Sequence, residues 1–461
     1  MIGDHESPVP RTPIRRILYP LERFLRIEAS GGILLLAATV AALVWANVPH
    51  GAESYAHVWH TPGGFSIGGF TLSMSLSHWI NDSLMGVFFF VVGLEIKREI
   101  LVGELKQPRQ AALPIAAAFG GMVVPALIYF LFNSRGIASE GWGIPMATDI
   151  AFAVGVMALL GSRAPLSLKI FITALAIVDD LGAVLVIALF YTGSLNFQAL
   201  VLAAFLLLLM FVLNWIGVRA AGVYLIVGFA LWLALLDSGM HATLAGVLAA
   251  LAIPARRHIN GRDFLAHSRH YLGKFESSGV RDELVIPDTE QQNAMEGMET
   301  VLEAAQSPMA RLEHVLHPWV MYAIMPLFAL SNAGVTLIRG EGAALQVSLM
   351  QMFREPVTLG VMAGLFIGKP VGILAACWIT IRTGLGVKPR GVGWVGLLGA
   401  GSLAGIGFTM SLFIANLALD SEPYLTEAKL GFLAASLLSG IVGSVILLLA
   451  PRSEHAAAVA P

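Results

Sequence analysis

Residues 176–184 read AIVDDLGAV and place two adjacent acids, Asp179 and Asp180, in the middle of an apolar run from about residue 168 to 190. A run of roughly 20 apolar residues is long enough to cross the hydrocarbon core of a membrane as a helix. An ionisable side chain at the bilayer centre costs about 2.5 to 3.5 kcal/mol, so such residues usually face a bundle interior and serve a function. The acid pair therefore indicates a membrane helix that carries a functional site.

The composition of the whole chain indicates a protein that crosses the membrane many times. Of its 461 residues 57% are hydrophobic and only 13% are charged, and the mean hydropathy is +0.77, whereas soluble domains carry about 25% charged residues. The net charge of -2 gives no sign of nucleic-acid binding, because the basic residues are spread along the chain. The single cysteine, Cys377, excludes an intrachain disulfide and is expected to be a small core residue.

The apolar runs divide into twelve predicted spans. All are expected to be helices, because lipid offers no partners to backbone amides and the runs lack the two-residue alternation of barrel strands. With both chain ends on one side, 23 of the 28 lysine and arginine residues fall on that side and four on the other, while Lys369 lies within a span. Since basic residues collect in cytoplasmic loops, both ends are predicted to be cytoplasmic. The spans centre near residues 40, 90, 122, 152, 180, 208, 229, 247, 326, 369, 405 and 440.

The predicted fold class is therefore an all-α polytopic membrane protein of twelve transmembrane helices. The first span, residues 31–48, is expected to be retained, because no small-residue cleavage site directly follows a short apolar core. The longest polar interval, roughly residues 256–314, contains a predicted surface helix near 290–306. It is either a regulatory insertion or a disordered connector. The predicted segments are a cytoplasmic N-terminal segment (1–28), spans 1–8 (29–255), a cytoplasmic loop (256–314), spans 9–12 (315–450) and a cytoplasmic C-terminal tail (451–461).

Two of the predicted spans, the fourth and the eleventh, contain helix-breaking and polar residues. They read GWGIPMATDIAFAVG at 141–155 and GLLGAGSLAGIGFTMS at 396–411. Each is the middle member of a triplet of spans, and interrupted segments at corresponding positions in two halves are typical of inverted-repeat transporters that bind their substrate at the breaks. Close packing of glycine-rich helices is the alternative explanation.

The charged residues within the spans indicate a site that holds a cation or a proton. Asp149 follows Thr148 at the interruption of the fourth span, and Lys369 lies near the middle of the tenth. Neighbouring helix positions point about 100° apart, so Asp179 and Asp180 need different roles. The alternative is that one or both simply pair with Lys369 as a structural bridge. A single lysine cannot neutralise three acids. The remaining carboxylates, with a threonine hydroxyl and freed carbonyls, suit a hard cation such as sodium, which would compete with protons for the same oxygens.

The ends of the interrupted helices add to the electrostatics of this site. Helix N-termini carry partial positive charge and C-termini partial negative charge. Where two interrupted helices cross, we expect Asp149 to offset facing positive ends and Lys369 to offset facing negative ends.

Several motifs closely resemble those of the NhaA family of sodium/proton antiporters over roughly residues 15 to 450. They are MATDIAFAVG, AIVDDLGAV, IGKPVG, GIGFTMS, VGLEIKRE and LEHVLHPW, in matching order. The resemblance implies a twelve-helix fold with inverted repeats and two crossed, interrupted helices. It also implies electrogenic exchange of cytoplasmic Na+ or Li+ for external H+ in the bacterial cytoplasmic (inner) membrane, without a cofactor. Membrane lipid and a second copy of the chain are the implied partners, with residues 50–78 as a possible dimer contact.

The resemblance also implies roles for individual residues. Asp180 resembles the principal Na+ ligand and proton carrier, and Asp179 resembles its partner in binding. Thr148 and Asp149 would shape the site at the break, and Lys369 would balance its charge. The candidates for pH sensing are Glu95, Lys97, Arg98, Glu99, His241, Glu313, His314 and His317. For His241, and for Asp82 at a further family position, a structural role is the alternative.

Histidine titrates near neutrality, which suits pH sensing. A solvated helix end with ordinary salt bridges is the alternative for the cluster of Glu95 and its neighbours. The histidines at 50, 57, 60 and 78 are irregularly spaced, which favours a solvated loop over a metal cluster.

Three other functions fit the sequence less well. An intramembrane aspartyl protease would carry its two acids on different helices, one of them in a GxGD motif that this chain lacks. A cation channel would need pore-lining rings or filter loops. A sodium symporter of organic anions would be favoured by an arginine near a midplane pocket, and none is present. The sequence contains no convincing phosphate-binding glycine loop, so it does not imply that the protein uses ATP.

Overall fold

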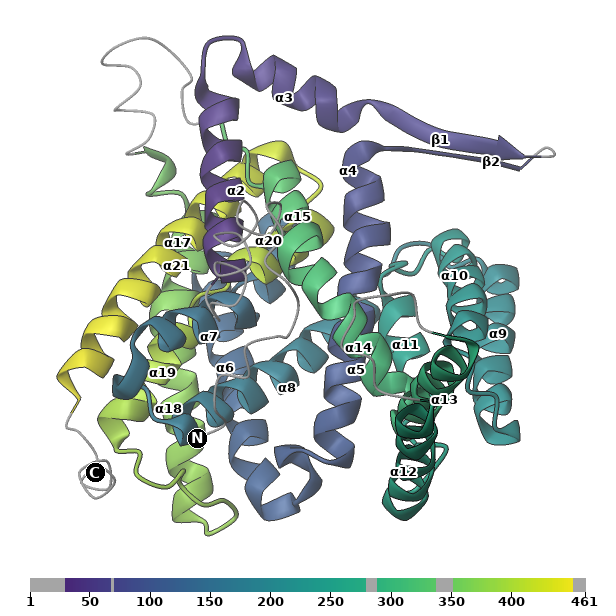
Figure 1. The fold of residues 1–461 in the computed structure, drawn as a ribbon. Coiled ribbons are helices and arrows are strands. Elements are labelled where there is room, and N and C mark those ends of the chain that lie inside the picture. The colour runs from purple at the N-terminus through teal and green to yellow at the C-terminus, as the bar shows by residue number, and fades with distance from the viewer. Residues whose placement is uncertain (1–29, 68–69, 279–287, 337–350, 451–461) are drawn as a thin grey trace. The chain divides into compact units, whose positions relative to one another are not determined.

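The computed structural model describes residues 30–67, 70–278, 288–336 and 351–450, and these ranges are mostly helical (Figure 1). The predicted N-terminal segment and C-terminal tail lie outside them. The α-helices are α2 (Ser30–Asn47), α3 (Gly51–His60), α4 (Leu76–His78), α5 (Met85–Leu101), α6 (Pro108–Phe132), α7 (Ile150–Leu159), α8 (Leu166–Phe190), α9 (Phe197–Ile216), α10 (Ala221–Asp237), α11 (Leu244–Ala252), α12 (Gly261–Ser277), α13 (Thr289–Ala305), α14 (Pro308–Trp319), α15 (Met325–Asn332), α17 (Pro356–Ala363), α18 (Lys369–Arg382), α19 (Trp394–Ala404), α20 (Phe408–Ala418) and α21 (Glu422–Leu449).

Shorter turns of helix join or extend several of these elements. Three are π-helical and three have the tighter 3-10 geometry. The π-helices are η1 (Trp79–Leu84), η5 (Val320–Ile324) and η6 (Gly364–Gly368), and the 3-10 helices are η2 (Glu104–Lys106), η3 (Ile137–Met146) and η4 (Gly161–Arg163).

The helices make this a multi-pass membrane protein. Within the described residues, eight helical segments are long and apolar enough to cross a membrane, or nine if the bent pair α19 and α20 is one span. The three other predicted spans correspond to α5, α10 and α11. Of these, α5 and α10 have 17 residues and α11 has nine, so each is shorter than the 18 residues that the longer spans reach.

The polar stretch 50–78 differs from the loop that the sequence predicted. It contains α3 and an antiparallel hairpin of β1 (Pro62–Ile67) and β2 (Phe70–Ser75), paired from Pro62 opposite Ser75 to Ile67 opposite Phe70. The segment FTLSMS alternates larger apolar with small polar residues, which is the period of a strand, and this was the missed signal.

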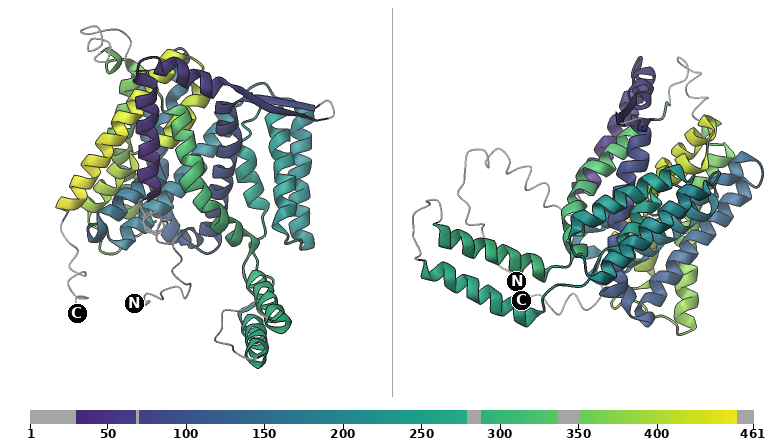
Figure 2. Two further views of the ribbon diagram at one scale, coloured as in Figure 1. Left: turned by 45° about the horizontal axis from the view of Figure 1, so that its top comes forward. Right: turned by 90° about the vertical axis from the view of Figure 1, so that its right-hand side faces the viewer.

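The predicted cytoplasmic loop contains two helices where one was expected. Its second helix, α13, corresponds to the surface helix predicted near 290–306, and α12 was not predicted. The two helices lie side by side (Figure 2). The start of α12 is tied to the end of α13, because the backbone amides of His258 and Ile259 donate to Ala304 O at 3.0 and 3.3 Å. The pair is therefore an antiparallel helical hairpin.

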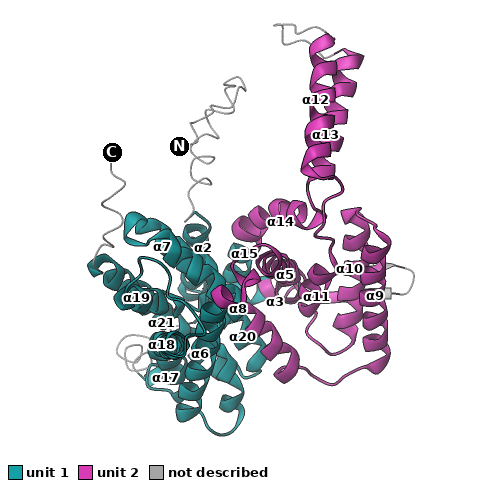
Figure 3. Ribbon diagram, turned by 90° about the horizontal axis from the view of Figure 1, so that it is seen from below, with its two compact units in different colours: residues 1–58, 112–179, 325–461 teal, residues 59–111, 180–324 magenta. Residues whose placement is uncertain are grey.

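The chain forms two compact units (Figure 3). Unit 1 comprises residues 1–58, 112–179 and 325–461, and unit 2 comprises residues 59–111 and 180–324. Both interrupted helices belong to unit 1. The boundary between the units falls inside α8, between Asp179 and Asp180.

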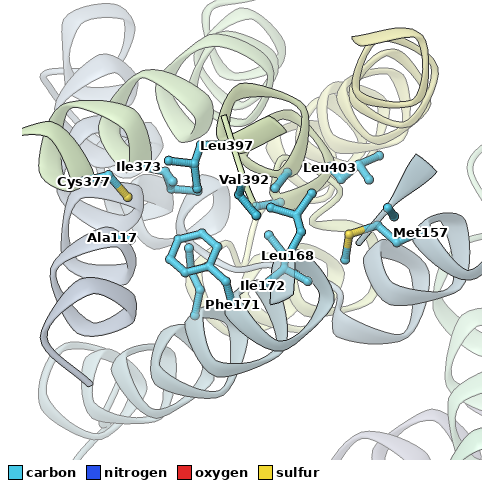
Figure 4. Close-up of a cluster of buried hydrophobic side chains, with 14 of the residues drawn as sticks. Ala117, Met157, Leu168, Phe171, Ile172, Ile373, Cys377, Val392, Leu397 and Leu403 are labelled. Carbon is cyan, nitrogen blue, oxygen red and sulfur yellow. The ribbon is translucent and has the colours of Figure 1, made fainter. Parts of the chain in front are cut away.

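Unit 1 has an apolar core to which α6, α7, α8, α18 and α19 contribute (Figure 4). Phe171, Ile172 and Ile373 lie in this cluster, each at most 3% exposed. Cys377 is buried among them, as expected of a small core residue. The core fixes the helices from which the charged side chains of unit 1 project.

Two glycines let α6 and α18 approach closely. A Cβ on Gly120 would overlap the carbonyl oxygen of Gly372, and a Cβ on Gly372 would overlap that of Gly120. The neighbouring Gly121 faces Lys369, since a Cβ there would lie 3.8 Å from Lys369 Cε. Because glycine has no side chain, the backbones of Gly120 and Gly372 can pack at this distance.

Candidate ion-binding site

The fourth predicted span is interrupted at residues 147–149. The 3-10 helix η3 contains Pro145 and ends at Met146, and the backbone is extended at Ala147 and Asp149 before α7 begins. Asp149 is the N-cap of α7, where its Oδ1 accepts a hydrogen bond from Phe152 N at 3.1 Å. An aspartate at this position satisfies a free amide at the start of a helix.

The eleventh predicted span is interrupted at residues 405–407, where α19 and α20 meet at an angle of 45°. Gly405 starts the break. A Cβ at this position would lie 2.6 Å from both Leu365 O and Ser439 Oγ, so any larger residue would push neighbouring elements apart.

Backbone and hydroxyl groups join the two breaks directly. Asp149 N donates to Ile406 O at 2.7 Å, and Thr148 Oγ1 donates to Ala404 O at 3.0 Å. Ala404 is the last residue of α19, so Thr148 satisfies a carbonyl that the interruption leaves without an intrahelical donor. The two breaks therefore supply each other's missing hydrogen-bond partners.

The Asp149 carboxylate lies at the N-termini of two helices. Besides the contact to α7, its Oδ2 accepts from Thr409 N at 3.2 Å and from Thr409 Oγ1 at 2.5 Å, in the first turn of α20. A negative charge at these positions is stabilised by the partial positive charge of both helix ends.

Lys369 is fully buried and donates to two oxygens. Its Nζ lies 2.6 Å from Asp179 Oδ2, and it also donates to Met146 O. Met146 ends η3, so the ammonium faces the negative end of that helix. The π-helix η6 directly precedes Lys369, and Pro370 has no N–H to continue a regular ladder. A π-helical turn of this kind often occurs at a functional site.

The structure brings four of the five predicted ion-site residues together within unit 1. They are Thr148, Asp149, Asp179 and Lys369, each at most 1% exposed. The Thr148 hydroxyl and amide also lie near the Asp179 carboxylate. Asp180, the next residue of α8, is equally buried.

Unit 1 also contains site residues that were not predicted. The sequence motif GIGFTMS was noted, but Thr409 within it was not singled out, and neither was the carbonyl of Met146. Thr409 could have been suspected from its place just after the break, since a buried acid needs donors.

The arrangement suits a hard cation with oxygen ligands more than a transition metal ion. In the described ranges no three His, Cys, Asp or Glu side chains lie close enough to hold a metal ion by themselves. A cation at the acids of α8 would therefore also use hydroxyl or carbonyl oxygens, which hard ions accept.

Several pH-sensing candidates lie together in unit 2. Arg98 forms an ion pair with Glu313 and lies 3.5 Å from Glu99, and His317 Nε2 lies 4.0 Å from Glu95 Oε1. These contacts join α5 to α14.

The other candidates of unit 2 have different surroundings. His314 is exposed. Lys97 Nζ donates to Leu251 O at 2.6 Å and to Ile253 O at 2.5 Å, at the C-terminal end of α11. A lysine there caps a helix C-terminus.

His241 and Asp82 also lie in unit 2. His241 Nε2 donates to the carbonyl of Tyr191. Asp82 lies in the π-helix η1, and its backbone carbonyl accepts from Trp232 Nε1 at 3.0 Å.

A multi-pass helical membrane protein with two interrupted helices joined at buried charges has the features of a secondary transporter. A family model described as Na+/H+ antiporter 1 matches residues 22–447, and the chain belongs to this family. It is 51% identical to a Na(+)/H(+) antiporter NhaA of Oleidesulfovibrio alaskensis over 435 residues, which is 94% of this chain and 95% of that protein. It is 48% identical to the NhaA of Koribacter versatilis, over 94% of this chain and 92% of the relative, and 49% identical to the NhaA 2 of Syntrophotalea carbinolica, over 93% and 96%.

Proposed function

We propose that this protein exchanges cytoplasmic Na+ or Li+ for external H+ by alternating access, with net movement of charge. The observation that carries the proposal is the fully buried Lys369–Asp179 ion pair, with Asp149 and Asp180 buried in the same membrane protein. One ammonium leaves two carboxylates that need a proton, a cation or helix-end charge. Membership in the Na+/H+ antiporter family supports Na+ and H+ as the two ions.

The contacts of the acids support a division of labour between them. Asp149 already accepts three hydrogen bonds from the N-termini of α7 and α20, so it has little capacity for a mobile ion. Asp179 Oδ2 accepts a hydrogen bond from Lys369 Nζ at 2.6 Å. Among the described residues, none donates a hydrogen bond of normal geometry to Asp179 Oδ1. We therefore assign binding of the transported ions to Asp179 and Asp180, and shaping of the site to Asp149 and Thr148.

Competition between the two ions then produces exchange. A carboxylate away from water holds either a proton or a cation, and arrival of one favours loss of the other. If the carrier reorients only when loaded, Na+ moves one way and H+ the other. The titration belongs to the coupled acids as a group rather than to either residue alone.

The proposed architecture has twelve transmembrane helices with both termini cytoplasmic, in the bacterial inner membrane. Two triplets of spans would be the inverted repeats. The first triplet consists of α6, the interrupted span η3–α7, and α8. The second consists of the span α17–α18, the interrupted span α19–α20, and α21. The hydrogen bonds between their two breaks support a crossing of the fourth and eleventh helices. The interval 256–314 would be cytoplasmic. No cofactor is needed, and lipid and a second copy, with the stretch 50–78 as a contact, are the proposed partners.

We also propose that the cluster of Arg98, Glu313, Glu99, Glu95 and His317 adjusts activity to pH. Its members are joined by ion pairs whose strength depends on protonation, and a histidine is among them. Replacing Arg98 by Gln should move the pH dependence of exchange. An unchanged pH profile would remove this role.

The experiment that tests the function uses everted vesicles with an acidic lumen. Adding Na+ or Li+ should alkalinise the lumen, and Asp180→Asn should abolish the response without loss of protein from the membrane. Alkalinisation that survives Asp180→Asn would refute the role of Asp180, and absence of a response at every pH would refute the function. A channel would pass Na+ without coupling to the proton gradient, so the same vesicles separate the two.

A further inference from the structure

The helical hairpin of α12 and α13 has an apolar strip that its own packing leaves exposed. The strip consists of Leu265 and Leu272 on α12 and Met295 and Leu302 on α13, each between 44 and 53% exposed. Exposed leucines elsewhere in the chain can face lipid. These two helices carry too many charges to cross a membrane, and neither is among the candidate spans.

The four side chains lie on the same face of the hairpin. Leu272 follows Tyr271, which packs against Gly297, and Met295 and Leu302 follow the buried Ala294 and Val301. One step along a helix turns the side chain by about 100°, so each exposed residue points to the side of the packed seam. Because the two helices are antiparallel, this turn leads to the same side in both. Leu265 lies two turns before Leu272 and continues the strip.

Charges of opposite sign flank the strip. Arg262 and Arg269 lie beside the leucines of α12, with Glu276 one turn after Leu272, whereas α13 is acidic and places Glu299 beside Met295 and Leu302. An anionic membrane surface would attract the first flank and repel the second. A second copy of the same hairpin, turned by a two-fold rotation, places the basic flank of α12 opposite the acidic flank of α13 in both directions.

We propose that this strip is a contact between two copies of the chain, which form a four-helix bundle from two hairpins. Tyr271 and Gly297 lie at the same height along the two antiparallel helices. The two-fold rotation therefore places Leu272 of one copy near Met295 of the other, and Arg269 near Glu299. Four apolar side chains make a small interface. Confinement of both copies to one membrane raises their effective concentration and permits a weak contact to form.

Disulfide cross-linking in reconstituted liposomes tests the contact. One tagged copy carries Leu272→Cys and a differently tagged copy carries Met295→Cys, and the buried Cys377 stays in place in both. The matched control pair is Lys274→Cys with Asn293→Cys. These residues are exposed at the same level on the opposite face of the hairpin. Under mild oxidation the first pair should form the mixed dimer faster than the control pair.

Charge reversal makes the test specific. Arg269→Glu or Glu299→Arg alone should slow the cross-link of the first pair, by about two- to fivefold for an exposed ion pair. Combining both reversals in each copy should restore it. Equal cross-linking of the two cysteine pairs would overturn the proposal, as would a double reversal that fails to restore the rate. Protection of Leu272→Cys from a water-soluble maleimide, without cross-linking, would assign the strip to another occupant.

Discussion

Replacing Lys369 by methionine tests the charge balance of unit 1 most directly. Methionine retains an apolar stem of similar length and removes the ammonium, so packing changes little while Asp179 Oδ2 loses its donor at 2.6 Å. Both side chains of this pair are fully buried. The variant therefore leaves a carboxylate in an apolar interior without its counter-charge.

The size of the effect follows from two limits. Removing one partner of a buried ion pair typically costs about 3 to 5 kcal/mol. The carboxylate can take a proton instead, and protonating an ordinary aspartic acid with a pKa of about 3.9 at pH 7 costs about 4 kcal/mol, which caps the loss. We expect the free energy of unfolding to fall by about 3 to 4 kcal/mol at pH 7.

The same reasoning gives the sign of the pH dependence. In the variant the folded state holds a proton on Asp179 that the unfolded state releases at neutral pH. Stability should then rise by about 1.4 kcal/mol for each pH unit lowered, until the unfolded aspartic acid also protonates. In the parent protein Lys369 stabilises the ionised form of Asp179, so the slope from Asp179 should be smaller.

A double-mutant cycle of Lys369→Met and Asp179→Asn checks the magnitude. Unfolding is followed in mixed detergent micelles at several pH values between about 5 and 8. The double variant has no buried charge at the pair and should lie within about 1 to 2 kcal/mol of the parent. A Lys369→Met protein as stable as the parent at pH 7 would refute the reasoning. A double variant no more stable than Lys369→Met alone would refute it as well.

Two further changes test how the breaks and the helix packing are held. Thr409→Val keeps the shape of the side chain but removes its 2.5 Å hydrogen bond to Asp149, so it should lower the free energy of unfolding by about 1.5 to 3 kcal/mol. Thr409→Ser keeps the hydroxyl and should retain most of the parent's stability. Thermal unfolding of the two variants, measured side by side, checks this difference. Gly372→Ala puts a methyl group against the backbone of Gly120 and should cost about 1 to 3 kcal/mol, whereas Gly222→Ala in α10, with no atom near its Cβ position, should be neutral or slightly stabilising. Equal melting temperatures for the two alanine variants would contradict the packing described for α6 and α18.

The sequence was sufficient for the class of fold and for the buried charges, for one physical reason. Lipid penalises ions and unpaired amides so strongly that an apolar run with Asp179 in its centre can hardly be accidental. The helix breaks were also predictable, because Pro145 and the glycines around Gly405 disfavour a continuous helix. Each of these signals is local and can be recognised within a single span.

The partners of the charges were less predictable because they are distant along the chain. Thr409 is 260 residues from Asp149, and its role depends on how two breaks meet in space. The hairpin of β1 and β2 and the helix α12 lie in polar segments, where hydropathy carries little information. The nine-residue α11 is shorter than any membrane-spanning window, so hydropathy alone cannot delimit it.

Hydrogen bonds distinguish acids that the sequence alone could not rank. Composition presents Asp149 and Asp179 as equivalent carboxylates within apolar runs. In the fold, Asp149 is held by amides and a hydroxyl that belong to the helix ends and cannot leave, whereas Asp179 is held by the ammonium at the end of the flexible Lys369 side chain. A partner on a flexible side chain can move away when a cation arrives, and fixed amides cannot. From this difference we infer that ion exchange takes place on α8 and that the break at Asp149 provides its rigid frame.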